Sequence, residues 1–344
     1  MNKVQLKFNK VNKMENQSIT GVTVLAYDFS KAFDQLDHRT ILHHLSLNSF
    51  PEGFVRWTAS YLHGRTQRVK LNGHLSSPLP VLSGVPQGSL LGPFLFNLVV
   101  GSLHAVDKQH NQIVKYVDDC TFVIPIGPNT LNACIIEHEN MVRWSDSVGL
   151  RINPRKCKAL WIPKSANAVI PTIPDFDIVN ELRILGVVFT PDLKWNAHLR
   201  QTNKIVSKRL FGLRILRPIF DHASLVKVYN GLILSIIEYC SPLLIGMSKQ
   251  NETQLTRLQR RAHRLICGPD CSCSCLEDLA VRRERAAVEL LLKISNNPSH
   301  PLNCLCPSRS SRSNRLLQPP ACTVRRRKSF FPTAVILLNK AFVD

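Results

Sequence analysis

The feature that most constrains this chain is a pair of adjacent acids, Asp118 and Asp119, between two apolar runs. Ile-Val at residues 113–114 precedes the pair, and Cys-Thr-Phe-Val at residues 120–123 follows it. Two strand-like runs around a short polar turn predict a β-hairpin with carboxylates at its tip. Because Asp-Asp is also an ordinary turn dipeptide, the pair alone does not establish a functional site.

A third acid, Asp28, lies at the end of the mostly apolar stretch 22–27, which predicts a strand. Asp28 could instead cap the helix predicted after it, although Asp34 or Asp37 fits that cap better. Paired carboxylates favour Mg²⁺, whereas His and Cys ligands would favour zinc. Phosphoryl transfer is the reaction that such an oxygen-ligand site serves best.

Between these acids lies a loop punctuated by Gly and Pro, SGVPQGSLLGP at residues 83–93, which leads into an apolar, helix-like segment at 94–100. Glycines let the backbone approach a ligand closely. They are also ordinary turn residues, and by themselves Gly84 and Gly88 would favour that simpler interpretation.

In this order, the segments YDFSKAFDQLDH (27–38), SGVPQGSLLGPFLFN (83–97) and YVDD (116–119) resemble the motifs of reverse transcriptases, most closely those of non-LTR (LINE-type) retrotransposons. Residues 144–160 are similar to the fourth palm motif of that family, 182–199 to its primer grip and 228–242 to its thumb. The resemblance weakens after Leu292. Ordered motifs with sensible spacing form a highly specific signal.

The resemblance implies an RNA-directed DNA polymerase that extends a DNA primer on an RNA template with dNTPs. Asp28 and Asp118 match the two metal-binding acids of the family, and Asp119 matches a position that supports the second metal or the primer end. Two Mg²⁺ ions, or Mn²⁺ in their place, would serve the nucleotidyl transfer.

Five further positions match substrate contacts of the family. Phe33 would select deoxyribose, Gln87 and Gly88 would face the incoming nucleotide and template, and Tyr116 would adjoin them. Lys156 matches a lysine proposed to protonate the leaving pyrophosphate. Each has a simpler alternative: a core phenylalanine, turn residues, a strand aromatic and a solvated lysine.

The expected fold is α+β: a right-hand polymerase palm with an antiparallel sheet, an all-α thumb-like region and a basic, partly disordered tail. The expected parts are 1–19 (N-terminal remnant), 20–192 (palm), 193–297 (thumb-like region) and 298–344 (tail with a short helix at 332–342). Strands are expected near 22–28, 66–72, 113–124 and 157–162, and helices near 35–48, 87–105, 130–148, 195–215, 222–238, 252–266 and 276–295.

The chain carries 44 Lys and Arg against 24 Asp and Glu, and this excess of 20 favours a polyanionic partner. Residues 193–344 hold 25 of the basic and only 9 of the acidic side chains, so most of the excess follows the palm motifs. Arg257, Arg260, Arg261 and Arg264 share much of one helical face. They could grip duplex phosphates, or form a solvated helix face.

Eleven cysteines raise the question of a metal site or disulfides, above all the Cys-Ser-Cys-Ser-Cys run at 271–275 with Cys267 before it. The C-x-C spacing is uncommon among zinc ligands, so we expect these cysteines to be free thiols and not zinc ligands. No signal peptide and no apolar run of about 18 residues is visible. We therefore expect no membrane partner, an intracellular location in the cytoplasm or nucleus, and reduced cysteines.

Only 27 residues precede Asp28, so the fingers region of the family, which holds the triphosphate, and its endonuclease domain are expected to be missing. Two hypotheses follow. The chain is a polymerase whose chemistry is carried by Asp28, Asp118 and Asp119, or it is a truncated, catalytically inactive remnant that binds nucleic acid without sequence specificity.

Overall fold

The computed structural model describes residues 19–173, 175–269, 271, 275–313, 315–321 and 323–340. The chain divides into two compact units, one ending at Asn180 and the other beginning at Glu181. We call them the sheet unit and the helical unit. The palm, thumb and tail assignments stay predictions, and the division after Asn180 lies before the expected boundary at 192.

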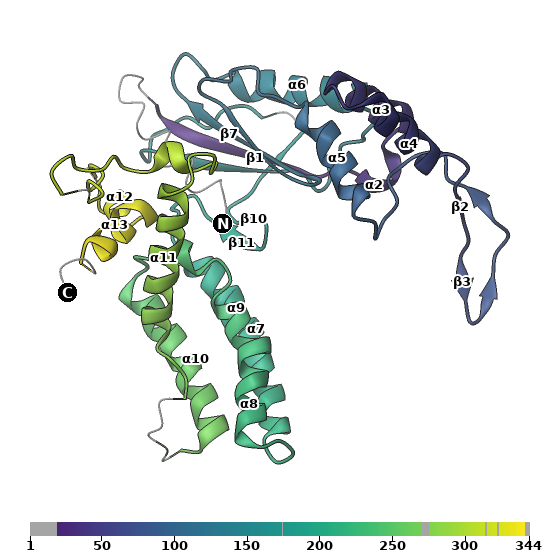
Figure 1. Ribbon diagram of the computed structural model, residues 1–344. Helices are drawn as coiled ribbons and strands as arrows, with labels where there is room; N and C mark the ends of the chain where they lie inside the picture. The colour runs from purple at the N-terminus through teal and green to yellow at the C-terminus, as the bar shows by residue number, and fades with distance from the viewer. Residues whose placement is uncertain are drawn as a thin grey trace. The chain divides into compact units, whose positions relative to one another are not determined.

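The sheet unit is built on a five-stranded sheet in the order β6-β7-β1-β8-β9 (Figure 1). All neighbouring strands pair antiparallel except β8 and β9, which are parallel. The mixed fold with a mainly antiparallel sheet agrees with the α+β expectation. The strands are β1 (Gly21–Tyr27), β6 (Gln112–Tyr116), β7 (Asp119–Ile126), β8 (Lys158–Pro163) and β9 (Asp177–Ile178).

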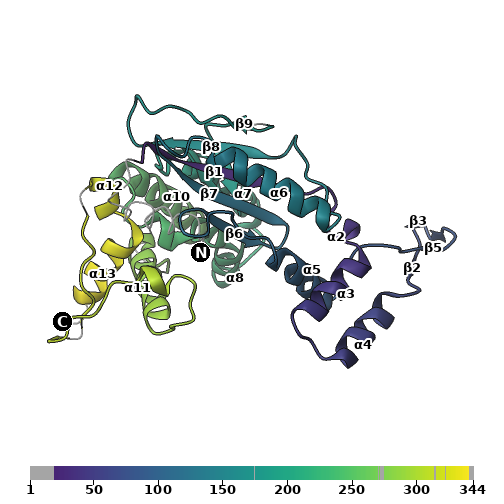
Figure 2. The same ribbon diagram turned by 90° about the horizontal axis from the view of Figure 1, so that it is seen from above.

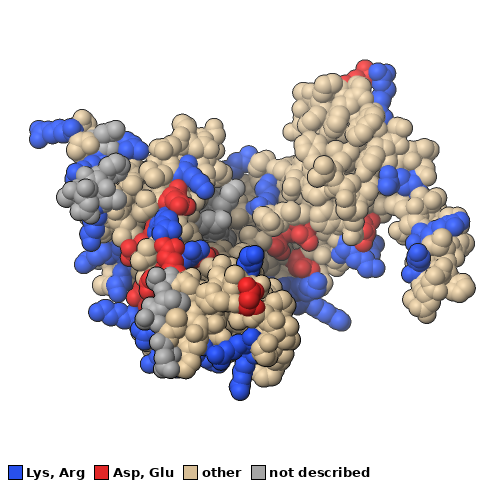
Figure 3. Space-filling model, turned by 60° about the horizontal axis from the view of Figure 1, so that its bottom comes forward, with Lys and Arg blue, Asp and Glu red and all other residues tan. Residues whose placement is uncertain are grey.

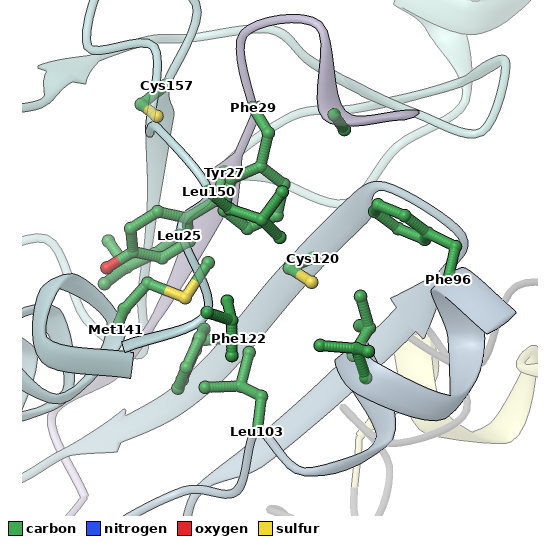
Figure 4. Packing of buried hydrophobic residues seen from close by; sticks show 14 of the residues in the cluster. Leu25, Tyr27, Phe29, Phe96, Leu103, Cys120, Phe122, Met141, Leu150 and Cys157 are labelled. Carbon is green, nitrogen blue, oxygen red and sulfur yellow. The ribbon is translucent and has the colours of Figure 1, made fainter. Parts of the chain in front are cut away.

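Two helices supply the core on one face of this sheet (Figures 2 and 4). Leu25 of β1 and Phe122 of β7 are fully buried together with Phe96 of α5 and Met141 of α6. Burying a side chain of this size contributes about 1.5–3 kcal/mol, so this layer stabilises the unit strongly. The helices of the sheet unit are α2 (Ala32–Gln35), α3 (His38–Leu47), α4 (Glu52–Leu62), α5 (Leu91–Gly101) and α6 (Ala133–Ser147).

Of the two acids expected to fit the helix cap better than Asp28, Asp37 is the cap, and its side chain accepts a hydrogen bond from the backbone N–H of Arg39 at the start of α3. Helix α4 was not expected. Its aromatic residues Phe54, Trp57 and Tyr61 stack successively at helical spacing, with ring centroids 5.8 and 5.7 Å apart. The i, i+3, i+7 spacing of these rings was the signal that could have revealed it.

The strand expected at 66–72 is instead the first half of an exposed hairpin arm (Figure 1). Its turn lies at Asn72-Gly73, both with positive φ, and the chain returns to pair with itself. The described side chains of its four short strands are all exposed. These strands are β2 (Thr66–Gln67), β3 (Lys70–Leu71), β4 (His74–Leu75) and β5 (Leu79–Pro80).

The helical unit opens with a small hairpin, β10 (Leu182–Ile184) with β11 (Val187–Phe189), and continues as helices. The four helices expected between 195 and 295 are present, and the second of them passes through a π-helical turn at Asn230–Leu234. The longer helices are α7 (Asn196–Leu216), α8 (His222–Tyr229), α10 (Lys249–Cys267) and α11 (Leu279–Ser295), with a short α9 (Ser235–Ile237) after the π turn.

The partial disorder expected from residue 298 stays a prediction, and the described residues of this segment include a buried cluster. Leu302 and Leu316 are buried in one cluster with α11 and with helix α13 (Phe330–Lys340), after a short α12 (Val324–Arg327). The apolar residues of this Pro- and Arg-rich segment are few and widely spaced, so its composition did not predict that they pack with α11. Within the described ranges, none of the helices has the length and apolar character needed to cross a membrane.

Lys115 joins the end of α5 to strand β6. Its Nζ donates to the backbone carbonyls of Val100, Gly101 and Leu103, at 2.8, 2.9 and 2.7 Å. Burial lowers the pKa of this ammonium group. Carbonyls at a helix C-terminus otherwise lack partners, so a cation there satisfies them and interacts favourably with the helix dipole.

We expect Lys115→Met to lower the free energy of unfolding by about 2 kcal/mol, because three carbonyls lose their donor. Urea denaturation followed by circular dichroism measures the change. Lys108→Met, at an exposed site nearby, is the matched control and should stay within about 0.5 kcal/mol of the wild type. Equal stability of the two variants would contradict a structural role for the Lys115 ammonium.

Candidate active site

The pairing of β1 with β7 brings the predicted acids to one end of the sheet. In this antiparallel register Tyr27 lies opposite Cys120, so Asp28 follows the last paired residue of β1 and Asp119 precedes its counterpart in β7. The hairpin predicted around the acid pair is confirmed, since Tyr116 of β6 pairs with Asp119 of β7.

The turn of this hairpin holds an unusual backbone conformation. Val117, its first central residue, has φ of +55°, a left-handed value that β-branched residues rarely adopt and that hairpin turns usually give to Gly, Asn or Asp. Such a conformation costs on the order of 1–3 kcal/mol and persists where surrounding structure enforces it, often at functional sites. The strain therefore lies immediately before Asp118.

The three carboxylates interact electrostatically. Partial desolvation, with the negative charges of Asp118 and Asp28, raises the pKa of the Asp119 carboxyl above its ordinary value. Crowded acids disfavour one another's ionised forms. A bound cation would reverse this repulsion, so the site has an electrostatic preference for positive charge.

Asp28 is held by its backbone while one of its carboxylate oxygens stays unsatisfied. Its carbonyl accepts from the N–H of Asn153 at 2.8 Å. Its Oδ2 is buried and accepts no hydrogen bond from the described part of the chain. The Nζ of Lys156 lies 3.3 Å from that oxygen without hydrogen-bonding geometry. Lys156 is thus brought to the predicted acids, on a side chain that is two-thirds exposed.

The loop predicted to face the substrate packs against the segment that follows Asp28. Gly84, with φ of +88°, lies so close that an added Cβ would be 2.6 Å from the carbonyl oxygen of Phe33. The Nε2 of Gln87 donates to Oδ1 of Asp34 at 2.9 Å. Gly88 is exposed, with φ of +80° and open space where a Cβ would stand. The loop thus offers free backbone at Gly88.

Phe33 and Tyr116 lie in different surroundings. The Phe33 ring is half-buried and stacks on Phe96 of α5, with centroids 4.8 Å apart. One face of the ring therefore packs as an ordinary core phenylalanine would. Tyr116 is 61% exposed at the end of β6. Their predicted roles in substrate binding stay predictions.

Two residues of the site were not identified as such from the sequence. Asp34 was considered only as a helix cap, yet it orients Gln87. His38 Nε2 lies 2.9 Å from the carbonyl oxygen of Gly84 and fixes the same loop. Both lie in the motif that contains Asp28, where side chains at strand-to-helix turns are candidates for loop contacts.

Comparisons with known proteins show which family the chain belongs to. Residues 1–189 match the family described as "Reverse transcriptase (RNA-dependent DNA polymerase)". The chain is 23% identical over 256 residues to the RNA-directed DNA polymerase from mobile element jockey of Drosophila melanogaster, covering 70% of this chain and 28% of that protein. It is 25% identical over 262 residues to a probable RNA-directed DNA polymerase from transposon BS of the same organism, covering 71% and 28%.

The Pol polyprotein from type-2 retrotransposable element R2DM, also of Drosophila melanogaster, is 27% identical over 184 residues, 47% of this chain and 17% of the polyprotein. Among solved structures, a telomerase from Candida tropicalis in complex with a telomeric RNA fragment aligns with a TM-score of 0.44 and 10% identity, over 87% of this chain and 50% of that one. The chain spans less than a third of the length of the curated relatives named above. The family match extends over more than half of the chain, which therefore belongs to the reverse transcriptase family.

Proposed function

We propose that this chain carries the polymerase site of a non-LTR retrotransposon reverse transcriptase, an RNA-directed DNA polymerase. The observation that carries the proposal is the gathering of Asp28, Asp118 and Asp119 at one end of a mainly antiparallel sheet, with a glycine-containing loop packed on the segment that follows Asp28. The template would be RNA and the product DNA, as the name "RNA-directed DNA polymerase" of the curated relatives suggests, and the proposal adds a DNA primer and dNTPs as substrates.

The residues fit a pair of divalent cations. The Oδ2 of Asp28, which already pairs with the Lys156 ammonium at 3.3 Å, and the raised pKa of Asp119 both favour positive charge at this site, and an all-oxygen ligand set suits Mg²⁺ or Mn²⁺. Within the described ranges the three carboxylates do not form a group whose ligand atoms all lie within 4.8 Å of one another. When bound, such ions activate the primer hydroxyl and stabilise charge on the reacting phosphate.

Each side chain then has a role in this proposal. Asp28 and Asp118 hold the cations, and Asp119 supports the second cation or the primer end. Lys156, which lies beside Asp28 in the structure, would donate a proton to the leaving pyrophosphate. Gln87, oriented by Asp34, and the open backbone of Gly88 contact the nucleotide and template.

The helical unit supplies exposed cations for the phosphate backbone. Arg257, Arg260, Arg261 and Arg264 are all exposed on α10, whose opposite face buries Leu255 and Leu258. Exposed Lys and Arg side chains are spread widely over the face shown in Figure 3. Such contacts fix a duplex by its phosphates and carry no sequence preference.

The alternative function, a non-catalytic body that binds nucleic acid, would use the same exposed cations. It differs in one respect only: the three acids would then carry out no chemistry. Substituting one of the acids and measuring both DNA synthesis and duplex affinity therefore separates the two functions.

Asp118→Asn should abolish magnesium-dependent primer extension on poly(rA)/oligo(dT), with a loss of at least about 100-fold, because a charge-stabilising group in the reaction centre is removed. Duplex affinity at constant salt should change little. Asp146→Asn removes the same charge from an exposed site on α6 and is the matched control, expected to retain synthesis.

Absence of synthesis from wild-type chain that is folded and binds the duplex would overturn the polymerase proposal and favour the non-catalytic alternative. Synthesis that survives in Asp118→Asn would instead remove these acids from the reaction centre. Circular dichroism of each variant confirms that it is folded before either comparison is made.

Asp119→Asn should stabilise the metal-free chain at neutral pH. A raised pKa means that the folded state binds this proton more tightly than the unfolded state, so ionised Asp119 destabilises the fold as the pH rises through and above its unfolded pKa. We expect a gain of about 0.5 kcal/mol at pH 7 and low salt, discounted for the exposure of this residue.

Urea denaturation at a series of pH values measures this gain, which should vanish below about pH 4, where both states are protonated. High salt should reduce it by screening. A gain that increased on acidification would contradict the assigned repulsion among the three acids.

A further inference from the structure

We propose that His222, Cys267 and Cys275 bind a structural Zn²⁺ ion in the helical unit, remote in sequence from the predicted acids. These three side chains form a group whose potential ligand atoms all lie within 4.8 Å of one another. Nitrogen and thiolate ligands select zinc over Mg²⁺, so this site would differ in chemistry from the carboxylate site.

The distances between the ligand atoms are near those of a zinc centre. His222 Nε2 lies 3.4 Å from Cys267 Sγ, and the two sulfurs of Cys267 and Cys275 lie 3.2 Å apart. Zn–N and Zn–S bonds in tetrahedral geometry place nitrogen and sulfur about 3.5 Å apart, and two sulfurs about 3.8 Å apart. An expansion of about half an ångström between the sulfurs would therefore accommodate the ion.

Three separate segments converge on this point. His222 is the first residue of α8, Cys267 is the last residue of α10, and Cys275 lies in the connection between α10 and α11. Helices α8 and α10 pack on each other, which sets the first two ligands side by side. A metal ion would thus join the start of one helix to the end of another.

The third ligand is positioned by contacts that lie just beyond it. Gln259 of α10 donates through Nε2 to the backbone carbonyl of Glu277, at 2.7 Å. Asp278 caps α11 by accepting from the N–H of Ala280, at 2.6 Å. Residues two and three positions after Cys275 are therefore fixed to α10 and α11, and the thiol is held near the end of α10. Outer contacts of this kind orient metal ligands.

Metal access and ligand chemistry also agree with zinc. His222 is exposed and the two cysteines are half-buried, so the site is open to an entering ion. Three protein ligands suffice to hold zinc, and a fourth position can be filled by a further thiol or by water. Cys271 lies four residues from both Cys267 and Cys275, a C-x₃-C spacing that falls within the range of zinc ligand pairs.

The expectation of thiols rested on the C-x-C run alone. It did not take account of the wider C-x₃-C spacing, and it could not include His222, which lies 45 residues before Cys267 along the chain. Only the packing of α8 on α10 brings the histidine to the cysteines. This is why the sequence pattern did not reveal the group.

The test is the metal content of the full chain, purified without chelator after expression with added zinc. Elemental analysis should find about one zinc per chain, and Co²⁺ substitution should give the thiolate-to-cobalt absorption of a tetrahedral site. Removing zinc with a strong chelator should lower the temperature of thermal unfolding, because an ion that binds only the folded state stabilises it.

The variants His222→Gln, Cys267→Ser and Cys275→Ser should each lose the zinc. Cys304→Ser, at an exposed cysteine outside the group, is the matched control and should keep it. Circular dichroism establishes that each variant is folded. Should a ligand variant fail to fold, titration of chelator-treated wild-type chain with Zn²⁺ against a competing chromogenic chelator supplies the same answer.

Wild-type chain that binds no zinc in that titration would overturn the proposal. So would zinc that stays bound to a folded His222→Gln, Cys267→Ser, Cys275→Ser triple variant, since the ion would then lie elsewhere. Neither result depends on polymerase activity, so the zinc site and the proposed function succeed or fail separately.

Discussion

The antiparallel pairing of β1 with β7 is the constraint on which the rest of the sheet unit depends. It sets Asp28 and Asp119 at the same end of the sheet, one residue beyond the pair of Tyr27 and Cys120. Because the side-chain period of a strand is two, a slip of one residue would turn Leu25 and Tyr27 to the other face of the sheet, away from the cluster that they share with Phe122. The hydrophobic layer therefore fixes the register, and the register places the acids.

This dependence explains how the fold tolerates an unfavourable site. The crowded carboxylates disfavour one another's ionised forms, and a left-handed Val117 costs on the order of 1–3 kcal/mol. The buried residues beneath them, such as Phe122 and Phe96, contribute about 1.5–3 kcal/mol each and are numerous. The core can thus hold charges and a turn that a two-stranded hairpin alone could not keep in place.

The features that the sequence predicted correctly are those whose pattern lies within a short stretch of the chain. The hairpin around Asp118, the strand before Asp28, and the helices from α7 to α11 were indicated by periodicity and turn residues within a few positions. Contacts between distant segments were not: Gln87 with Asp34, Lys156 with Asp28, and Leu316 with α11 depend on tertiary packing. Only the first half of the hairpin arm was predicted, as a strand at 66–72. Its exposed strands lack the alternation of apolar and polar residues that packing on a core imposes.

Ligand chemistry separates the two proposed metal sites. The acids of the sheet unit offer only oxygen, which holds Mg²⁺ weakly enough to leave room for substrate phosphates. His222, Cys267 and Cys275 offer nitrogen and sulfur, which hold zinc tightly and contribute to folding. Since a thiolate site has little affinity for Mg²⁺, magnesium would not displace zinc from it. Loss of zinc would then appear as loss of stability, and loss of magnesium as loss of synthesis.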